Sequence, residues 1–476
     1  MATIGFEEKL WASADKLRNN MDAAEYKHVV LGLIFLKYVS DTFMEKHKEL
    51  MEEDEEFAED IDAYMAEGVF WVPENARWDY IAKHSKQAEI GQIVDNALDL
   101  IEKDNDSLRG VLPKNYSRSE LDKRILGEII DLFTNINVGG SIGKEKDVLG
   151  RVYEYFLGKF AANEGKGGGE FYTPKSIVKL MVEMIEPFKG YVYDPACGSG
   201  GFLVESLRYV WNKLEEKTTE LGWPEAEIEA EKQKVAIKNF RGIDKDNFLS
   251  KVAKAYLAIL GDGRGGVHCE NSLDKFTNWS AKTKEDIVEG TFDVIVTNPP
   301  FGKKLSIDAT EILELYDLGH KWKQDGDGNF VMEGLVDKQP PQILFIERCF
   351  QMLKPGGRMG IVLLESIFGM PKYQYVVDYI RRKSKILAVV TLPEDLFQPN
   401  THAKCCVLIC QKYKEDESFE SCGDYNIFMS DVKWCGHDSR GNVTYRYLEN
   451  GEKTVLDEIP LVAERYKEMK QEDAQL

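Results

Sequence analysis

The sequence has no paired cysteine motif and no long apolar run. Its eight cysteines are scattered or adjacent, and none form a C-x-x-C pair. This spacing excludes the usual patterns of a zinc site or a disulfide framework and indicates a reducing, cytoplasmic compartment. The most apolar early stretch, 29–36, is too short to span a bilayer and ends at Lys37. The first residues are amphipathic and include acids, unlike a signal peptide. We therefore expect no metal site, no membrane segment and no secretion signal.

Positive charge is also scarce. The 476 residues include 61 lysines and arginines against 82 aspartates and glutamates, which gives a net charge of -21. A protein that grips DNA unaided usually has a basic footprint, because neutralising phosphates supplies most of the non-specific affinity. The chain as a whole lacks such a footprint, although a basic cluster remains at 381–383. If nucleic acid is the substrate, we expect a partner chain to supply many of the contacts that bind it.

Size and composition allow two or three domains, each with its own core. The hydrophobic fraction of 43% and the charged fraction of 30% are typical of a globular protein. In residues 1–145, apolar side chains recur at helical spacing over 6–21, a second and more buried helix is expected over 26–44, and 90–132 holds further candidates. No strand alternation interrupts them. These patterns predict an N-terminal all-helical domain with a structural role.

From 146 onward the pattern changes to short apolar runs that alternate with helices. A glycine-rich break at 165–169 precedes Thr173-Pro174, which is a good helix start. The expected strands are 191–193, 240–243, 292–297, 358–363, 387–392 and 405–410. This alternation predicts an α/β domain with a doubly wound, mostly parallel, Rossmann-like sheet over 146–412. A polar C-terminal tail, 413–476, is expected to end in a charged helix and to contact another subunit.

A glycine-rich loop, DPACGSGG at 194–201, follows the first expected strand and leads into a helix. An acid begins the loop, its glycines do not follow G-x-G-x-x-G, and it lacks the Lys-Ser/Thr of a phosphate loop. A leading carboxylate without phosphate-binding features suits a cationic ligand. S-adenosylmethionine, with its ammonium and sulfonium groups, fits that description. The alternative is a plain glycine turn.

Two later strand ends complete the predicted cofactor site. Asp244 ends the next strand, where an acid can accept hydrogen bonds from both ribose hydroxyls. A charged helical insert, 213–238, delays it in the chain, and Asp246 is the competing candidate. Asn271 follows the third apolar segment and is expected to contact the adenine of the cofactor. The alternative for Asn271 is a hydrogen bond at the end of the loop.

The motif Asn298-Pro299-Pro300-Phe301 directly follows the apolar run 292–296. The Asn side chain supplies an amide oxygen, and the aromatic ring supplies a flat face. Proline has no N–H, so the local backbone carbonyls lack a partner of their own and point outward. These groups suit a flat heterocycle that carries an exocyclic NH2. A strand-ending turn is the alternative, and the motif alone does not choose among adenine, guanine and glutamine.

Together these motifs resemble those of amino-methyltransferases that use S-adenosylmethionine. The order of DPACGSG and then NPPF, with GEFYTP upstream at 169–174, looks like the gamma class of DNA N6-adenine methyltransferases. Four further segments look like parts of the modification subunit of type I restriction-modification systems: 10–18, 31–38, 353–358 and 392–397. The resemblance covers most of the chain and weakens after about residue 412.

The resemblance implies a site-specific DNA methyltransferase that transfers a methyl group from S-adenosylmethionine to N6 of a flipped adenine. It implies the catalytic residues Asn298, Pro299, Pro300 and Phe301. It implies a cofactor site formed by Phe171, Tyr172, Thr173, Pro174, Asp194, Ala196, Gly198, Ser199, Gly200, Asp244 and Asn271. Members of this family act on double-stranded DNA with a DNA-specificity subunit and a second copy of the modification subunit, and a restriction subunit can join them.

Several alternatives stay open at this point. The site could methylate another planar amine, such as a protein glutamine or guanine in RNA, although the helical domain and the acidic charge argue against an RNA enzyme. A non-catalytic assembly subunit would have no need of the intact loop and Asn298. No nuclease constellation of carboxylates and lysine is evident. Phe397 could stack on the second face of the base or be a core ring, and 302–340 could form a mobile substrate loop.

Overall fold

The chain forms two compact units in a computed structural model. The first comprises Met1–Glu164 with Lys251–Gly265, and the second comprises Gly165–Ser250 with Gly266–Leu476. The structure describes residues 6–17, 23–53, 57–66, 69–135, 152, 155–156, 159, 173–259, 266–302, 305–398, 402–448 and 451–473. The predicted cofactor residues Phe171 and Tyr172 lie outside these ranges.

The described part of the first unit is helical and contains no strand, as the sequence predicts. Its helices are α1 (Phe6–Leu17), α2 (Ala23–Glu53), α3 (Ile61–Ala66), α4 (Trp78–Lys83), α5 (Ile90–Asp104) and α6 (Lys123–Thr134), with short 3-10 turns η1 (Phe57–Glu59), η2 (Glu74–Ala76) and η3 (Asp106–Leu108). Val94 and Leu98 of α5 and Ile130 of α6 are fully buried. Asp122 begins α6 by accepting a hydrogen bond from the Arg124 N–H at 2.8 Å.

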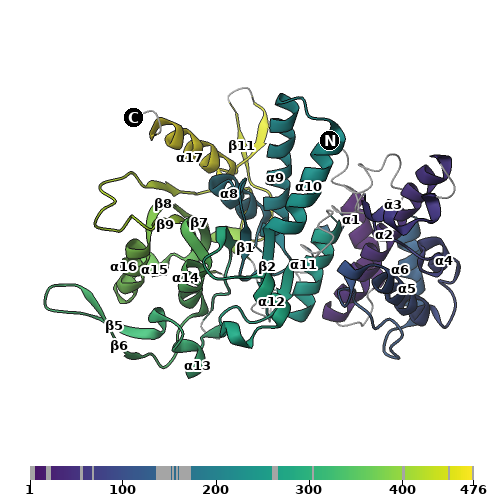
Figure 1. The fold of residues 1–476 in the computed structure, drawn as a ribbon, viewed down its shortest axis with the longest axis horizontal. Helices are drawn as coiled ribbons and strands as arrows, with labels where there is room; N and C mark the ends of the chain where they lie inside the picture. Colours follow the sequence, from purple (N-terminus) through teal and green to yellow (C-terminus); the bar gives the residue numbers. More distant parts are fainter. Residues whose placement is uncertain are drawn as a thin grey trace. The chain divides into compact units, whose positions relative to one another are not determined.

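The second unit is built on one large sheet (Figure 1). Among the described residues this sheet has eight strands in the order β10-β8-β9-β7-β4-β1-β2-β3. Adjacent strands run parallel except at β9, which is antiparallel to both β7 and β8. The strands are β1 (Val192–Asp194), β2 (Phe240–Asp244), β3 (Val267–Cys269), β4 (Phe292–Thr297), β7 (Leu353–Leu364), β8 (Ser384–Thr391), β9 (Cys405–Lys412) and β10 (Phe428–Asp431). The predicted doubly wound, mostly parallel sheet is confirmed.

Helices connect the parallel strands, because a parallel pair requires a crossover. Helix α8 (Lys175–Ile185) precedes β1. The helices between the strands are α9 (Gly201–Glu220), α10 (Glu225–Asn239), α11 (Asn247–Ile259, of which the residues from Lys251 belong to the first unit), α12 (Ala281–Asp286), α14 (Pro341–Met352), α15 (Ser366–Gly369) and α16 (Gln374–Lys383), with 3-10 turns η4 (Phe276–Asn278), η7 (Pro371–Tyr373) and η8 (Glu394–Phe397). The charged insert expected before Asp244 forms the end of α9 and all of α10. Helix α8 begins after Pro174, as predicted from the Thr-Pro pair.

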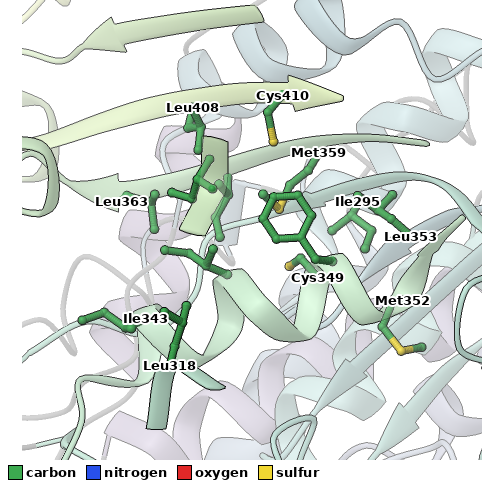
Figure 2. Packing of buried hydrophobic residues seen from close by; sticks show 14 of the residues in the cluster. Ile295, Leu318, Ile343, Cys349, Met352, Leu353, Met359, Leu363, Leu408 and Cys410 are labelled. Carbon is green, nitrogen blue, oxygen red and sulfur yellow. The ribbon is translucent and has the colours of Figure 1, made fainter. Parts of the chain in front are cut away.

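The main core of this unit lies between the sheet and helix α14 (Figure 2). Met359 and Ile361 of β7 are completely buried in it, because alternate residues of a strand point to the same face. Gly360 lies between them and faces α8, where an added Cβ would come within 3.3 Å of the Met181 Cε. The strand is therefore covered by helices on both faces, which holds its carboxyl end in place.

The segment after 412 joins the second unit and does not form a separate tail. Strand β10 extends the sheet beside β8, β11 (Tyr445–Tyr447) and β12 (Lys453–Val455) form a hairpin, and α17 (Ile459–Asp473) packs on α8. Lys467 pairs with Glu183, and Lys470 pairs with Glu186. The predicted C-terminal helix is present, but the expected boundary at 413 differs from the structure. Because the segment after 412 is polar, its sequence pattern does not indicate strand β10, which forms its backbone hydrogen bonds with β8.

Residues 305–340 are also structured, in contrast to the mobile loop considered from the sequence. They form α13 (Thr310–Leu313), η6 (Asp317–Gly319) and a hairpin of β5 (His320–Gln324) and β6 (Phe330–Leu335). Two buried charged residues of α14 anchor this insertion. Glu347 accepts hydrogen bonds from the N–H groups of Asp317 and Leu318 at 3.0 and 2.8 Å, and Arg348 donates to the Tyr316 hydroxyl at 2.9 Å.

No helix within the described ranges is long and apolar enough to cross a membrane. In the same residues, no group of three or more His, Cys, Asp and Glu side chains is arranged to hold a metal ion.

Candidate active site

The predicted site residues meet at one edge of the sheet. In the strand registers Asp194 lies beside Gly242, and Asp244 lies beside Cys269, so the carboxyl ends of β1, β2 and β3 are adjacent. Strand β4, which ends just before Asn298, is the neighbour of β1 on its other side. The chain passes from β1 to β2 in one direction and later returns to β4 in the other. Such a reversal point is where open α/β sheets bind ligands.

Hydrogen bonds from backbone N–H groups hold the glycine-rich loop against the end of β2. The Cys197 N–H donates to the Ile243 carbonyl at 2.9 Å, and the Gly198 N–H donates to Asp244 Oδ2 at 2.9 Å. Gly198 and Gly200 have φ values of 52° and 86°, a backbone conformation that favours glycine. A Cβ placed on Gly198 would meet nothing within 4 Å. The loop therefore leaves open space at Gly198, into which a ligand can approach the backbone.

Asp194 is buried, at 1% exposure. Its Oδ1 accepts a hydrogen bond from the Ala196 N–H at 3.0 Å. Burial raises the pKa of the carboxyl group from its ordinary value to about 7, although the Thr297 hydroxyl and the Ala196 N–H oppose the shift. Oδ2 has no partner at hydrogen-bond geometry among the residues that the structure describes. A buried acceptor of this kind fits a donor from a ligand.

Asp244 and Asp246 have different roles. Asp244 accepts backbone hydrogen bonds from Gly198 and Asp246, both at 2.9 Å, and these bonds lower its pKa while burial raises it more strongly. Asp246 accepts from the Leu249 N–H at 2.8 Å in the first turn of α11. Asp244 faces the loop, whereas Asp246 caps a helix. The geometry favours Asp244 as the residue that faces a ligand.

Asn271 is exposed just beyond β3, and its Oδ1 accepts a hydrogen bond from the Leu273 N–H at 3.2 Å. This bond is the loop-end interaction considered as the alternative for Asn271, and it leaves the Nδ2 donor for other partners. The neighbouring Ser272 was not identified from the sequence. Its buried hydroxyl donates to the Pro195 carbonyl at 2.5 Å and ties the end of β3 to the glycine-rich loop.

Asn298 is half-buried and oriented by a residue far away in the sequence. Its Nδ2 donates to Thr173 Oγ1 at 3.0 Å. Its Oδ1 is buried and has no hydrogen-bond partner within the described part of the chain. Pro299 and Pro300 follow directly and offer no N–H to this oxygen. The amide therefore presents an unsatisfied acceptor at the end of β4, close to the end of β1.

The Phe301 ring is packed in the protein, at 3% exposure. It meets the Phe397 ring edge-on, with ring centroids 6.2 Å apart and an angle of 85° between the planes. Phe397 is buried as well, as expected for a core ring. This arrangement differs from the expectation that Phe301 offers a free face. A base could stack on Phe301 only after the ring becomes exposed.

Two threonines belong to this site, of which sequence reasoning missed Thr297 and predicted Thr173 as a cofactor residue. Thr297, completely buried at the end of β4, has a hydroxyl without a hydrogen-bond partner among the described residues and lowers the pKa of Asp194. Thr173 had been assigned to the cofactor, but its hydroxyl contacts Asn298. The position of Thr297 directly before the motif was the available signal. The contact with Thr173 has no local signal, because 125 residues separate the partners.

Comparisons with known proteins show which family and which solved structures the chain resembles. Residues 144–446 match the family model described as N-6 DNA Methylase, and residues 6–133 match the HsdM N-terminal domain. The chain is 39% identical over 320 residues to the type I restriction enzyme MjaIX methylase subunit of Methanocaldococcus jannaschii, an alignment that covers 63% of this chain and 51% of that protein. The chain thus spans about half the length of this relative.

Solved structures share the fold. A type I restriction-modification system methyltransferase subunit from Streptococcus thermophilus aligns with a TM-score of 0.61 at 20% identity, covering 97% of this chain and 92% of the other. A modification subunit of a putative type I restriction enzyme from Vibrio vulnificus aligns with a TM-score of 0.57 at 18% identity, and the alignment covers 96% of this chain and 97% of the other. Because the N-6 DNA Methylase model matches more than half of the sequence, the chain belongs to the N-6 DNA methylase family, which confirms the predicted resemblance.

Proposed function

We propose that this chain is the modification subunit of a type I restriction-modification complex. In this role it transfers a methyl group from S-adenosylmethionine to N6 of an adenine flipped out of double-stranded DNA. The observation that carries the proposal is the buried, unsatisfied Oδ1 of Asn298 beside the ligand-accepting edge of the sheet. Family membership favours an adenine amine over guanine or glutamine.

The residues at the ends of β1 and β2 fit S-adenosylmethionine. Asp194 Oδ2 is a free buried acceptor for a cationic group, and the open space at Gly198 allows close approach to the backbone. The half-buried Ala196 and Ser199 flank this point, and Gly200 begins α9. Asp244 would accept the ribose hydroxyls through lone pairs that its two backbone bonds leave free. Asn271 Nδ2 would donate to the adenine of the cofactor.

Asn298 would hold the target amine for transfer. An adenine in a duplex must be flipped out to reach the site, which costs a few kcal/mol. The Asn298 Oδ1 and the Pro299 carbonyl would accept the two N6 hydrogens and so direct the nitrogen lone pair at the methyl carbon. When bound, S-adenosylmethionine would supply the methyl group and its sulfur would leave with the electron pair, while the proton lost from N6 would pass through the Asn298 and Pro299 oxygens to water. Positioning supplies most of the acceleration.

Partner subunits would supply most of the contacts that bind DNA. With a net charge of -21 the chain is poorly suited to bind DNA alone, so we propose a DNA-specificity subunit and a second copy of the modification subunit, with a restriction subunit as a further member. The segment from 413 onward carries large exposed side chains, among them Met429 at 75% and Tyr447 at 74% exposure. Exposed apolar groups gathered on one segment support a subunit contact there.

Modification-sensitive sequencing of host DNA tests this function. Deletion of the gene is expected to remove N6-methyladenine from a split, two-part motif, and the wild-type gene is expected to restore it. Asn298→Ala is expected to abolish methylation, because the amine loses its main acceptor, while S-adenosylmethionine affinity measured by calorimetry stays nearly unchanged. An equal loss of cofactor affinity would contradict the role of Asn298. Unchanged host DNA would point to a protein or RNA amine, or to a non-catalytic subunit.

A further inference from the structure

The hydroxyl of Thr173 is directed at the target-amine acceptor. Thr173 immediately precedes the first turn of α8, and the Pro174 carbonyl begins that helix by accepting hydrogen bonds from the N–H groups of Ile177 and Val178. The threonine side chain is therefore held on a rigid element. From this position Thr173 Oγ1 accepts a hydrogen bond from Asn298 Nδ2 at 3.0 Å.

This hydrogen bond engages the nitrogen end of the amide and leaves the oxygen end available. An Asn side chain has two donors on its nitrogen and an acceptor oxygen, and rotation by half a turn exchanges them. With Nδ2 directed at Thr173, Oδ1 is the end without a partner among the described residues. Pro299 and Pro300, which follow Asn298, and Pro174, which follows Thr173, have no N–H to offer this oxygen. The surroundings thus leave Oδ1 as a free acceptor.

We propose that Thr173 is a positioning residue for methyl transfer: its hydroxyl fixes the amide of Asn298 with Oδ1 toward the N6 hydrogens of the target base. This inference rests on the proposed function. It assigns the side chain of Thr173 to positioning of the target base, where the sequence had predicted a contact with the cofactor. Without the hydroxyl, Nδ2 would lose its partner, and the amide could turn and present a donor to an amine that needs acceptors. The cofactor contacts of Asp194 and Gly198 would be untouched.

Three variants of the full chain, assembled with its specificity subunit, test whether the Thr173 hydroxyl positions Asn298, contacts the cofactor or has no role in methylation. Thr173→Val keeps the shape and removes the hydroxyl, and Thr173→Ser keeps the hydroxyl. Thr291→Val is the matched control, because this exposed threonine lies at the opposite end of β4 and its hydroxyl bonds only to the Val288 carbonyl in the contacts described. The measurements are the single-turnover methylation rate and the affinity for S-adenosylmethionine by calorimetry.

Thr173→Val is expected to lower the methylation rate on the order of a hundredfold, the effect of a misplaced reacting group, with cofactor affinity within about twofold of wild type. Thr173→Ser should restore most of the rate, and Thr291→Val should behave as wild type. The proposal is overturned if Thr173→Val methylates normally, if Ser does not rescue, or if cofactor affinity falls as much as the rate. A wild-type complex that binds the cofactor but methylates no adenine overturns the proposed function itself.

Discussion

Asp194 combines complete burial with an acidic side chain, which has a cost for stability. Its pKa is raised to about 7, mainly because burial disfavours the charged form. Between its ordinary pKa and about pH 7, the folded state holds a proton that the unfolded state has released. The free energy of unfolding therefore falls as pH rises through this window, and the loss is constant above it. In the proposed complex, the cationic cofactor would offset this cost.

Replacing Asp194 with asparagine is expected to stabilise the empty protein at neutral and alkaline pH. Asparagine keeps an acceptor for the Ala196 N–H and carries no charge, so the variant avoids the cost of a buried carboxylate. Its advantage over wild type should grow on the order of 2–3 kcal/mol from pH 5 to pH 7 and then stay level. Denaturant unfolding at several pH values measures this difference. If the free energy of unfolding changed with pH in the same way for both proteins, the raised pKa of Asp194 would be contradicted.

The same change is expected to weaken cofactor binding, because the ligand loses its charged partner. Stability and affinity should thus move in opposite directions in one variant. This opposition distinguishes a functional carboxylate from one that only supports the fold, for which both would fall together.

Helix α17 shows which contacts attach the C-terminal segment to the sheet. Ile459, Val462 and Tyr466 are buried, and the Tyr466 ring meets the Phe428 ring of β10 edge-on with centroids 5.4 Å apart. By contrast, the ion pair of Lys467 with Glu183 joins two partly exposed side chains. Exposed ion pairs contribute little to stability, since solvent screens them and ordering the side chains costs entropy.

Two adjacent substitutions on α17 test this contrast. Tyr466→Ala is expected to lower the free energy of unfolding by about 3 kcal/mol or more, the usual cost of removing a buried aromatic ring. Lys467→Ala is expected to change it by about 1 kcal/mol or less. Chemical denaturation of the full chain measures both. If the lysine variant were the less stable of the two, charge rather than apolar burial would attach this helix.

The whole molecule carries too much negative charge to hold a duplex unaided. At a net charge of -21 the average field repels phosphates, and local basic groups such as Arg382, paired with Asp378, are partly neutralised. The proposed active site is therefore expected to meet DNA when a partner supplies the basic contacts and the base reading.

The chain alone is expected to bind duplex DNA weakly, with a Kd of about 10 μM or higher at physiological salt, in the range of non-specific binding. Addition of the specificity subunit should tighten binding by about a thousandfold or more. Fluorescence anisotropy with labelled DNA, with and without that subunit, measures both values. Nanomolar binding by the isolated chain would show that it carries a DNA-binding face of its own.

Local patterns predicted a large part of this protein. The strand before Asn298 is an unbroken apolar run, and the strand before the glycine-rich loop ends at Asp194, so both were visible in the sequence. The structure confirms the six expected strands, which were visible because strands buried in the middle of a sheet need largely apolar residues. Strand β10 and the β5–β6 hairpin were missed. Their side chains are largely exposed, so no buried apolar run indicates them. Strand β10 forms by pairing with the distant β8, and β5 and β6 form by pairing with each other.

The family, the proposed reaction class and the sheet followed from residue order, because glycines, prolines and buried strands act through their immediate neighbours. Other features depended on tertiary contacts. The position of 413–473 in the second unit, the burial of Phe301 against Phe397 and the hydrogen bond from Asn298 to Thr173 each join residues far apart in the chain. Such contacts exist once the sheet has brought distant strand ends together. Sequence order therefore indicates the groups proposed to do the chemistry, and folding sets which atom of each group would face the substrate.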